Sequence, residues 1–289
     1  MKALITGGSG FIGSFLAEAL QQKGYEVTVL DTKNPKFTPN IPFLKGSVID
    51  RKFVLSALKG QDVVFHLAGI LGTHETVNNA YQTAEVNILG ALNVLDASRE
   101  HGVRVIDISK PNYWRNPYTI TKIAAEEFCL MYRDEFDMDV RGVRWFNVYG
   151  PRQKTIEEGY QKAVPTFTTN ALRGELISIY GNGMQGTDHI FVTDAVEAAI
   201  HVAEAPAEKV REIIDVGSGK EVTVNEIAQT IVKFCNSPSR IEYVPMRAGE
   251  TEDTRIRANI ELLQSLGYSQ KVPFEEGLKK TIEYYKQLV

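Results

Sequence analysis

Tyr118 and Lys122 are the two residues whose types and spacing most directly point to chemistry. They stand four positions apart in a predicted helix over residues 118–133, so they lie on one face, one turn apart. A free phenol has a pKa of about 10, but a nearby ammonium favours the phenolate. Lowering that pKa by ~3 units needs ~4 kcal/mol, which a site shielded from water can supply. The pair predicts an acid/base group. The alternative is an exposed helix pair, and its position in the fold decides between the two.

A glycine-rich turn near the start of the chain provides that position. Gly7, Gly10 and Gly13 separate an apolar run (residues 2–6) from a helical segment (residues 14–23). Such glycines permit a sharp turn and a close approach of phosphate, and the helix start offers free N–H groups. Asp31 ends the next strand, roughly 20 positions on, where a ribose hydroxyl needs a partner. The whole unit predicts a dinucleotide site rather than an ordinary structural turn.

Strands and helices alternate along the first half of the chain, which predicts a Rossmann-type, doubly wound parallel α/β sheet. We expect a dinucleotide-binding domain over residues 1–151 and a smaller α/β substrate domain over residues 152–186 and 217–289. The chain is expected to return to the first domain around residues 187–216. Asp194 is expected to cap a helix that runs to residue 205. The expected strands span residues 2–6, 26–30, 41–46, 62–69, 103–109, 139–147, 176–180, 189–192 and 211–216, and the expected helices span residues 14–23, 50–59, 76–101, 118–133, 164–173, 194–205, 224–235 and 275–287.

Composition narrows the classes of function. The chain has 289 residues, 43% of them hydrophobic, which is ordinary for a globular protein, and its net charge of -4 argues against nucleic acid as a partner. Cys129 and Cys235, the two cysteines, lack partners at metal-ligand spacing, so we expect reduced thiols and no metal site. The first residues enter a strand directly, and the apolar runs are too short for a bilayer. We expect a cytoplasmic protein without a signal peptide or membrane segment.

Several motifs together resemble the extended short-chain dehydrogenase/reductase family, in particular its nucleotide-sugar epimerases and dehydratases. They span most of the chain, and they are specific for the family but not for the substrate. The motifs are residues 6–13, Asp31, residues 64–68, residues 87–95, Tyr118 with Lys122, residues 144–152 and residues 247–250.

The resemblance implies NAD as the cofactor. Asp31 would accept from the adenosine ribose and repel the additional phosphate of NADP. Tyr118 would be the acid/base, Lys122 would hold the nicotinamide ribose, and Phe146 would touch the nicotinamide. The implied cofactor-binding residues are Gly7, Gly10, Phe11, Ile12, Asp31, Leu67, Ala68, Gly69, Asn87, Tyr118, Lys122 and Phe146.

The resemblance also implies a nucleotide-diphosphate sugar as substrate. Asn147 and Arg247 would hold the diphosphate, and Glu250 would hold the sugar or its ribose. Tyr180 and Ser109 are further candidates for substrate binding. Asn147 could instead cap a strand end, and Arg247 could be a solvated surface residue.

Three departures from the family pattern concern the substrate pocket. The usual serine or threonine after the fifth strand is missing, and Ser109, Asn112 and Thr119 are the candidate replacements. Only eight residues separate Ser109 from Tyr118, where relatives carry a much longer segment. The usual arginine is replaced in the run 187–189, so a diphosphate cation is lost unless Arg152 or His189 substitutes for it. In a milder departure, Ser47 stands where relatives often place an aspartate beside the adenine.

These features favour an NAD-dependent epimerase acting at C4 of a UDP-sugar through a transient 4-keto intermediate. Residues 110–111 lack the acidic pair of the dehydratases, and Asp31 argues against NADPH-dependent ketoreductases. Two alternatives stay open, namely an NAD(P)H-dependent ketoreductase and a non-catalytic NAD-binding sensor or scaffold. By resemblance, we expect a homodimer formed by the helices that contain residues 87–95 and 118–133.

Overall fold

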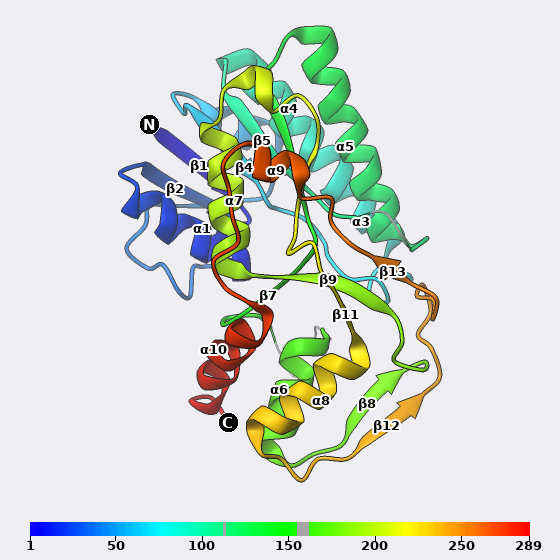
Figure 1. Cartoon of the computed structure of the whole chain (residues 1–289). Coiled ribbons are helices and arrows are strands. Elements are labelled where there is room, and N and C mark those ends of the chain that lie inside the picture. Colours follow the sequence, from blue (N-terminus) through cyan, green and yellow to red (C-terminus); the bar gives the residue numbers. More distant parts are fainter. Residues whose placement is uncertain (112–113, 155–161) are drawn as a thin grey trace.

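A computed structural model describes residues 1–111, 114–154 and 162–289, and a seven-stranded parallel sheet lies at its centre (Figure 1). The strand order is β10-β6-β5-β4-β1-β2-β3. Successive crossovers lead in opposite directions from β1, so the order reverses between β1 and β4, where doubly wound sheets bind ligands. The predicted fold class is confirmed. The strands are β1 (Lys2–Thr6), β2 (Glu26–Asp31), β3 (Phe43–Lys45), β4 (Val63–His66), β5 (Arg104–Ser109), β6 (Val140–Trp145) and β10 (Ile214–Val216).

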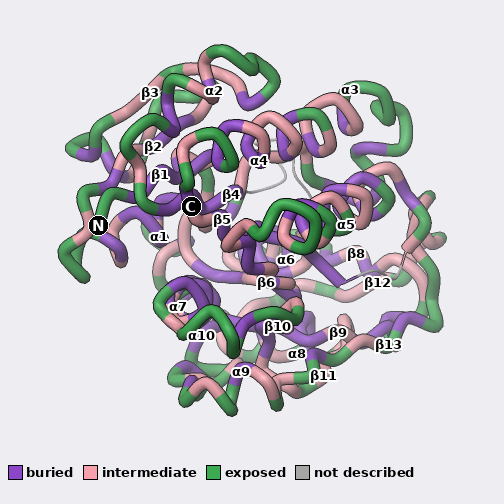
Figure 2. The backbone as a smooth tube through the Cα atoms, turned by 90° about the horizontal axis from the view of Figure 1, so that it is seen from above, coloured by how far each residue is buried: buried purple, intermediate pink, exposed green. Residues whose placement is uncertain are grey.

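Helices cover both faces of this sheet (Figure 1). On one face α1 (Phe11–Gln22) packs against α7 (Val192–Glu204). On the other face lie α2 (Arg51–Leu58), α4 (Gly90–His101) and α5 (Pro117–Phe136). The central strands appear as buried tubes between these layers in Figure 2, as expected for parallel strands with apolar side chains on both faces.

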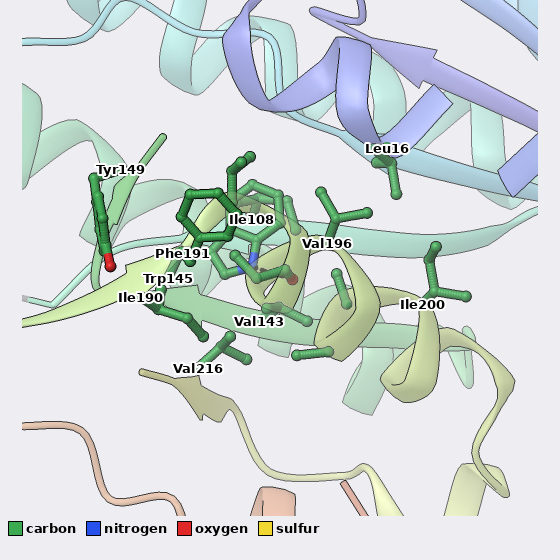
Figure 3. Close-up of a cluster of buried hydrophobic side chains, with 14 of the residues drawn as sticks. Leu16, Ile108, Val143, Trp145, Tyr149, Ile190, Phe191, Val196, Ile200 and Val216 are labelled. Atoms are coloured by element: carbon green, nitrogen blue, oxygen red, sulfur yellow. Dashed lines mark hydrogen bonds between the residues drawn. The ribbon is translucent and has the colours of Figure 1, made fainter. Parts of the chain in front are cut away.

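The core between α1, α7 and the sheet consists of packed aliphatic side chains together with aromatic ones such as Trp145 and Phe191 (Figure 3). Val196 and Ile200 of α7 lie near Leu16 of α1, and Val143 of β6 lies beneath them. All four are fully buried or nearly so. This packing joins a helix from residues 192–204 to the first helix of the chain, and the return of the chain to the first domain around residues 187–216 stays a prediction.

The remaining elements form smaller layers beside the carboxyl ends of the main sheet. Strand β9 pairs with β7, β11 and β13, and β8 pairs in parallel with β12. Helices α6, α8 and α10 pack on one another, and α9 packs on β10. The division into two domains stays a prediction. The bounds are β7 (Asn147–Tyr149), α6 (Ala163–Arg173), β8 (Ile177–Tyr180), β9 (Gly186–Phe191), η3 (Ala207–Lys209), β11 (Glu221–Thr223), α8 (Val224–Cys235), β12 (Ile241–Val244), β13 (Arg255–Ile256), α9 (Glu261–Ser265) and α10 (Phe274–Lys286).

The helix expected over residues 76–101 is present from Ala80 to His101 and is stopped at Gly102 (φ 67°), but it starts four residues later than expected. It consists of α3 (Ala80–Ala84), a π-helical turn η1 (Glu85–Leu89) and α4. One expectation about a helix was wrong. Asp194 does not cap α7, because the helix begins at Val192. Its buried carboxylate instead accepts from the backbone N–H groups of Lys271 (3.2 Å) and Val272 (2.8 Å).

Arg141 on β6 ties the sheet to the end of α7. Its side chain is 2% exposed and forms a two-pronged ion pair with Asp139, with N···O distances of 2.7 and 3.0 Å. The same guanidinium satisfies carbonyl oxygens that a helix end leaves without intrahelical donors, which suits the negative end of the helix dipole. These acceptors are the carbonyls of Val202, Ala203 and Ala205, at 2.7–3.0 Å.

Replacing Arg141 is therefore expected to destabilise the fold strongly. Arg141→Met leaves the carbonyls of Val202 and Ala205 without this donor, while Ala203 O and Asp139 keep only Arg104, at a cost of about 3 kcal/mol in the free energy of unfolding. Arg51→Met is the matched control, because Arg51 is 73% exposed and pairs with Asp96 at the surface; its cost should stay below about 1 kcal/mol. Denaturant unfolding measures both, and equal losses would contradict the assignment.

Candidate functional site

The glycine turn between β1 and α1 has the geometry of a phosphate cradle. Gly7 adopts φ +73°, and a Cβ there would lie 2.8 Å from the backbone nitrogen of Ala68. A Cβ on Gly13 would lie 2.5 Å from the carbonyl oxygen of Gly7, so α1 packs directly on the turn. Gly10 is the N-cap of α1 and offers no side-chain acceptor, which leaves the first N–H groups of a twelve-residue helix available. The turn fits a pyrophosphate, and Phe11 and Ile12 begin the helix above it.

Asp31 ends β2 beside this turn. Its Oδ2 accepts from the backbone N–H of Ser9 at 3.1 Å, and its Oδ1 accepts from that of Lys33 at 3.0 Å. Two backbone donors therefore hold the carboxylate next to the phosphate cradle. That Asp31 accepts from the adenosine ribose and repels the extra phosphate of NADP stays a prediction.

The segment after β4, formed by Leu67, Ala68 and Gly69, is fixed to the helices by Asn87. This asparagine lies in the π-helical turn and is 2% exposed. Its Oδ1 accepts from the backbone N–H of Ile70 at 2.7 Å, and its Nδ2 donates to Ile70 O and to Thr121 Oγ1, both at 3.0 Å. The amide of Asn87 thus makes its hydrogen bonds within the protein and fixes the segment that follows residues 67–69. Direct contact of Asn87 with the cofactor stays a prediction.

Tyr118 and Lys122 lie at the start of α5. Asn116 caps this helix by accepting from the N–H of Thr119 at 2.9 Å, and Pro117 occupies the first turn. The backbone N–H of Tyr118 donates to Thr76 Oγ1 at 3.3 Å. Lys122 is 8% exposed, so its ammonium lies in a partly dehydrated environment, and the alternative of an exposed helix pair is wrong.

Beneath Lys122 lies a buried group of titratable side chains that the sequence did not predict. Burial raises the pKa of Asp107 on β5, and the charge of Lys122 partly opposes that shift. Burial, with repulsion by Lys122, lowers the pKa of His66 on β4 to about 3. His66 is therefore neutral near pH 7, and its Nδ1 lies 2.8 Å from Thr6 Oγ1. Asp107 provides a buried carboxyl group close to the lysine of the predicted pair.

The candidates for the missing serine differ in their surroundings. Ser109 is 3% exposed at the end of β5, and its Oγ has no hydrogen-bond partner among the described residues. Thr119 Oγ1 accepts from the Lys110 ammonium at 2.9 Å. Asn112 lies outside the described residues. The choice among the three stays open.

Lys110 is a further site residue that sequence reasoning missed. It follows β5 directly and is 8% exposed, and its Nζ donates to Pro111 O at 2.6 Å. The Nζ lies 5.4 Å from the centroid of the Tyr118 ring. Burial, followed by repulsion from Lys162 and Lys122, lowers the pKa of Lys110 to about 7. The sequence did contain one signal for a role of Lys110 in the site, because this lysine directly follows a buried strand and lies in the shortened segment before Tyr118.

Three predicted substrate-binding residues meet on the other side of the site. Arg247 forms an ion pair with Glu250, with Nη2···Oε1 at 2.5 Å and Nε···Oε2 at 3.1 Å. The Arg247 guanidinium also lies 4.7 Å from the centroid of the Tyr180 ring. Thr73 Oγ1 donates to Glu250 Oε1 at 2.6 Å, which links the group to the chain beyond β4. Arg247 is therefore part of an organised cluster and not an isolated surface residue.

The loop that carries Arg247 and Glu250 is attached to the chain leading into α5. Trp114 Nε1 donates to Thr254 Oγ1 at 2.6 Å, and Asn116 Nδ2 lies 3.5 Å from the carbonyl oxygen of Gly249. Phe146 and Asn147 follow β6, the neighbour of β5 in the sheet. Phe146 is buried, and Asn147 begins β7 in register with His189 of β9, so it also serves the strand pairing.

The structure does not support either suggested replacement for the lost cation. Burial lowers the pKa of His189 to about 4, so this side chain is neutral near pH 7. Arg152 forms a two-pronged ion pair with Glu18 of α1, at 2.9 and 3.0 Å. The charge of Arg152 is therefore directed to α1 and not to the site. A different cation, Lys162 at the start of α6, is close enough to Lys110 to repel it.

No helix in the described part of the chain is long and apolar enough to cross a bilayer. Within residues 1–111, 114–154 and 162–289, no three His, Cys, Asp or Glu side chains are grouped so that they could hold a metal ion. Cys129 and Cys235 are both free thiols.

Comparison with known proteins identifies the family. Residues 3–217 match the model of the NAD-dependent epimerase/dehydratase family, and the chain belongs to this family. The predicted membership is confirmed, and NAD is the family's cofactor. One relative, UDP-N-acetyl-alpha-D-glucosaminuronate decarboxylase of Bacillus cytotoxicus, is 33% identical over 99% of this chain and 98% of its own. Another, UDP-glucose 4-epimerase of Mycolicibacterium smegmatis, is 30% identical over 99% of each.

Solved structures agree with this assignment. UDP-glucose 4-epimerase of Thermotoga maritima, solved with UDP-glucose, has a TM-score of 0.91 at 29% identity and covers 100% of this chain and 99% of its own. UDP-glucose 4-epimerase of Thermus thermophilus, in complex with NAD, also has a TM-score of 0.91, at 27% identity, with 100% of both chains covered.

The position of Asp31 leads to a prediction about cofactor choice. Asp31→Ser should weaken NAD binding by about 10-fold or more, because a charged hydrogen bond is worth about 1.5–3 kcal/mol. The same change should strengthen NADP binding, because a repelling charge is removed. Titration calorimetry with both dinucleotides measures the two affinities. Asp62→Ser is the control, since Asp62 precedes β4 and accepts from the N–H of Lys2 at 2.7 Å. An unchanged NAD-to-NADP ratio would contradict the assignment of Asp31.

Proposed function

We propose that this protein is an NAD-dependent nucleotide-sugar epimerase that inverts C4 of a UDP-sugar. The carrying observation is the placement of the Tyr118–Lys122 pair. It begins the helix after β5, two strands from the glycine turn of β1, and the Arg247–Glu250 loop is hydrogen-bonded to the same helix start. The similarity to UDP-glucose 4-epimerases supports this reading.

In the proposed site, each predicted residue has a distinct task. The glycine turn would hold the pyrophosphate, Asp31 the adenosine ribose, and Lys122 the nicotinamide ribose. When bound, NAD supplies a reversible hydride acceptor for the sugar carbon. Phe146 would lie against the cofactor ring, while Arg247, with Tyr180 beside it, would bind the nucleotide diphosphate.

The proton chemistry falls to Tyr118. Its phenolate would take the proton of the C4 hydroxyl as that carbon becomes a carbonyl, and the phenol would return the proton when the hydroxyl forms on the other face. Lys122, held in a partly dehydrated environment, would favour the phenolate because an ammonium nearby stabilises the charged form of a phenol. The proton and the hydride are both returned, so the reaction has no net redox change.

The decarboxylase relative favours a second candidate reaction on the same site. A sugar oxidised at C4 that carries a carboxylate at C6 is a β-keto acid, and such acids lose carbon dioxide readily. The relative at 33% identity is named for decarboxylation of a UDP-linked uronate. The ketoreductase and the non-catalytic sensor stay alternatives to both reactions.

Tyr118→Phe tests the proposal directly. Loss of the acid/base group should lower the rate by about 10²–10⁴-fold, while NAD binding should persist. The substrates are UDP-glucose, UDP-N-acetylglucosamine, UDP-glucuronate and their galacto epimers, with products resolved by chromatography and mass. Formation of a UDP-pentose from UDP-glucuronate would identify the decarboxylase. Steady oxidation of added NADH with a keto sugar would identify the ketoreductase.

The epimerase assignment has a clear contrary outcome. Wild-type protein with verified bound NAD that interconverts none of these sugars would overturn it. Glu127→Gln is a suitable control, because Glu127 is an exposed residue of the same helix and should leave the rate unchanged.

We also propose a homodimer formed by α4 and α5, which contact one another. Leu89, the last residue of η1 before α4, and Ile120 and Met131 of α5 are exposed. Tyr132 instead faces the chain's own core, where its hydroxyl donates to Asp96 at 2.6 Å. Sedimentation should give twice the chain mass, and Ile120→Asp should shift the protein to the monomer. A wild-type monomer at micromolar concentration would contradict this arrangement.

A further inference from the structure

Lys110 brings a second ammonium to the tyrosine of the proposed site. It lies in the short connection between β5 and α5, and its side chain is nine-tenths buried. Two oxygen acceptors fix its position, namely Pro111 O at 2.6 Å and Thr119 Oγ1 at 2.9 Å. A buried lysine with defined acceptors has a fixed location, unlike a solvated surface lysine.

The fixed position places the charge over Tyr118. The Nζ of Lys110 is 5.4 Å from the centroid of the phenol ring, within the range of a cation–π contact. Thr119, which accepts from Lys110, is the next residue of the helix, so the lysine and the tyrosine are held to the same helical turn. A phenolate carries a full negative charge and would attract this ammonium more strongly than the neutral phenol does.

The surrounding charges explain why such an interaction is favourable. Burial, followed by repulsion from Lys162 at the start of α6 and from Lys122 on α5, lowers the pKa of Lys110 to about 7. Asp107 on β5 faces Lys122, and Glu250 is already paired with Arg247. The buried Lys110 is repelled by the buried Lys122 and the half-buried Lys162, and an anion formed near Lys110 relieves that repulsion.

We propose that Lys110 is a positioning residue for the Tyr118 base, with its ammonium stabilising the phenolate from above the ring while Lys122 acts from one helical turn away. The inference rests on the proposed function only in taking the Tyr118 phenolate as the base. The two groups titrate together, because the charge of each stabilises the opposite charge on the other. Removal of the ammonium makes the phenol harder to ionise.

The test follows the ionisation of Tyr118 itself. NAD-loaded protein is titrated with base while tyrosinate absorbance is recorded, and Tyr118→Phe identifies the contribution of this residue. In Lys110→Gln, which can still donate to Thr119 but carries no charge, the tyrosinate transition should move up by about one pH unit or more. Lys110→Arg keeps the charge and should stay nearer to the wild type. Where turnover is detectable, the low-pH limb of the rate profile should move with the transition.

A transition of Tyr118 that stays at the same pH in both Lys110→Gln and Lys110→Met would overturn the inference. An upward shift in Lys110→Arg as large as that in Lys110→Gln would also overturn it, because the effect would then reflect packing and not charge. Thr119→Val, which removes one acceptor of Lys110 and keeps its charge, should give a smaller shift than Lys110→Gln. The titration measures the ionisation of Tyr118 and needs no sugar turnover. Absence of epimerase activity would therefore refute the proposed function without affecting the test of Lys110.

Discussion

The parallel register of the central sheet is the constraint on which the proposed site depends. All seven strands end at one edge, and β1, β4, β5 and β6 are adjacent there. Thr6 is in register with His66, and His66 with Asp107. The glycine turn, the wall at residues 67–69 and Lys110 therefore begin at nearly the same level. A slip of one residue in any of these pairings would turn alternate side chains to the opposite face of the sheet.

Local patterns predicted the elements whose ends have local causes. Helix α8 matches its predicted range because Thr223 and Glu226 form a capping box and Asn236 ends the helix in a left-handed conformation. The helix expected over residues 76–101 starts only at Ala80 and contains a π-helical turn just before Gly90, which the spacing of its apolar residues does not indicate. Strands β11 and β13 have only three and two residues and form by pairing with β9. They are too short to show an alternation of apolar and polar residues, so the sequence does not predict them.

The site residues, too, were predictable where their signal is local and unpredictable where it depends on tertiary contacts. The glycines and Asp31 form one contiguous unit, and the sequence contains all the information needed to place them. Arg247 and Tyr180 are remote in sequence, and only the resemblance to a family indicated that they act together; the structure brings them to 4.7 Å. Asp194 was misread because an acidic residue near a helix start looks like a cap, whereas its true partners lie more than 70 residues away. Lys110 and Asp107 were missed because the burial of a charge is a tertiary property.

The buried charges of the site are arranged unequally, and this arrangement bears on how the site responds to ligands. Lys122 has the carboxyl group of Asp107 near it, whereas Lys110 is faced by the ammonium groups of Lys122 and Lys162. The charge on Lys122 is thus offset by the protein's own acid, while that on Lys110 is opposed by its neighbours. An anion formed near Lys110 favours the charged form of this lysine and so opposes the lowering of its pKa by burial and by the neighbouring ammonium groups. Formation of the proposed Tyr118 phenolate and protonation of Lys110 would therefore favour one another.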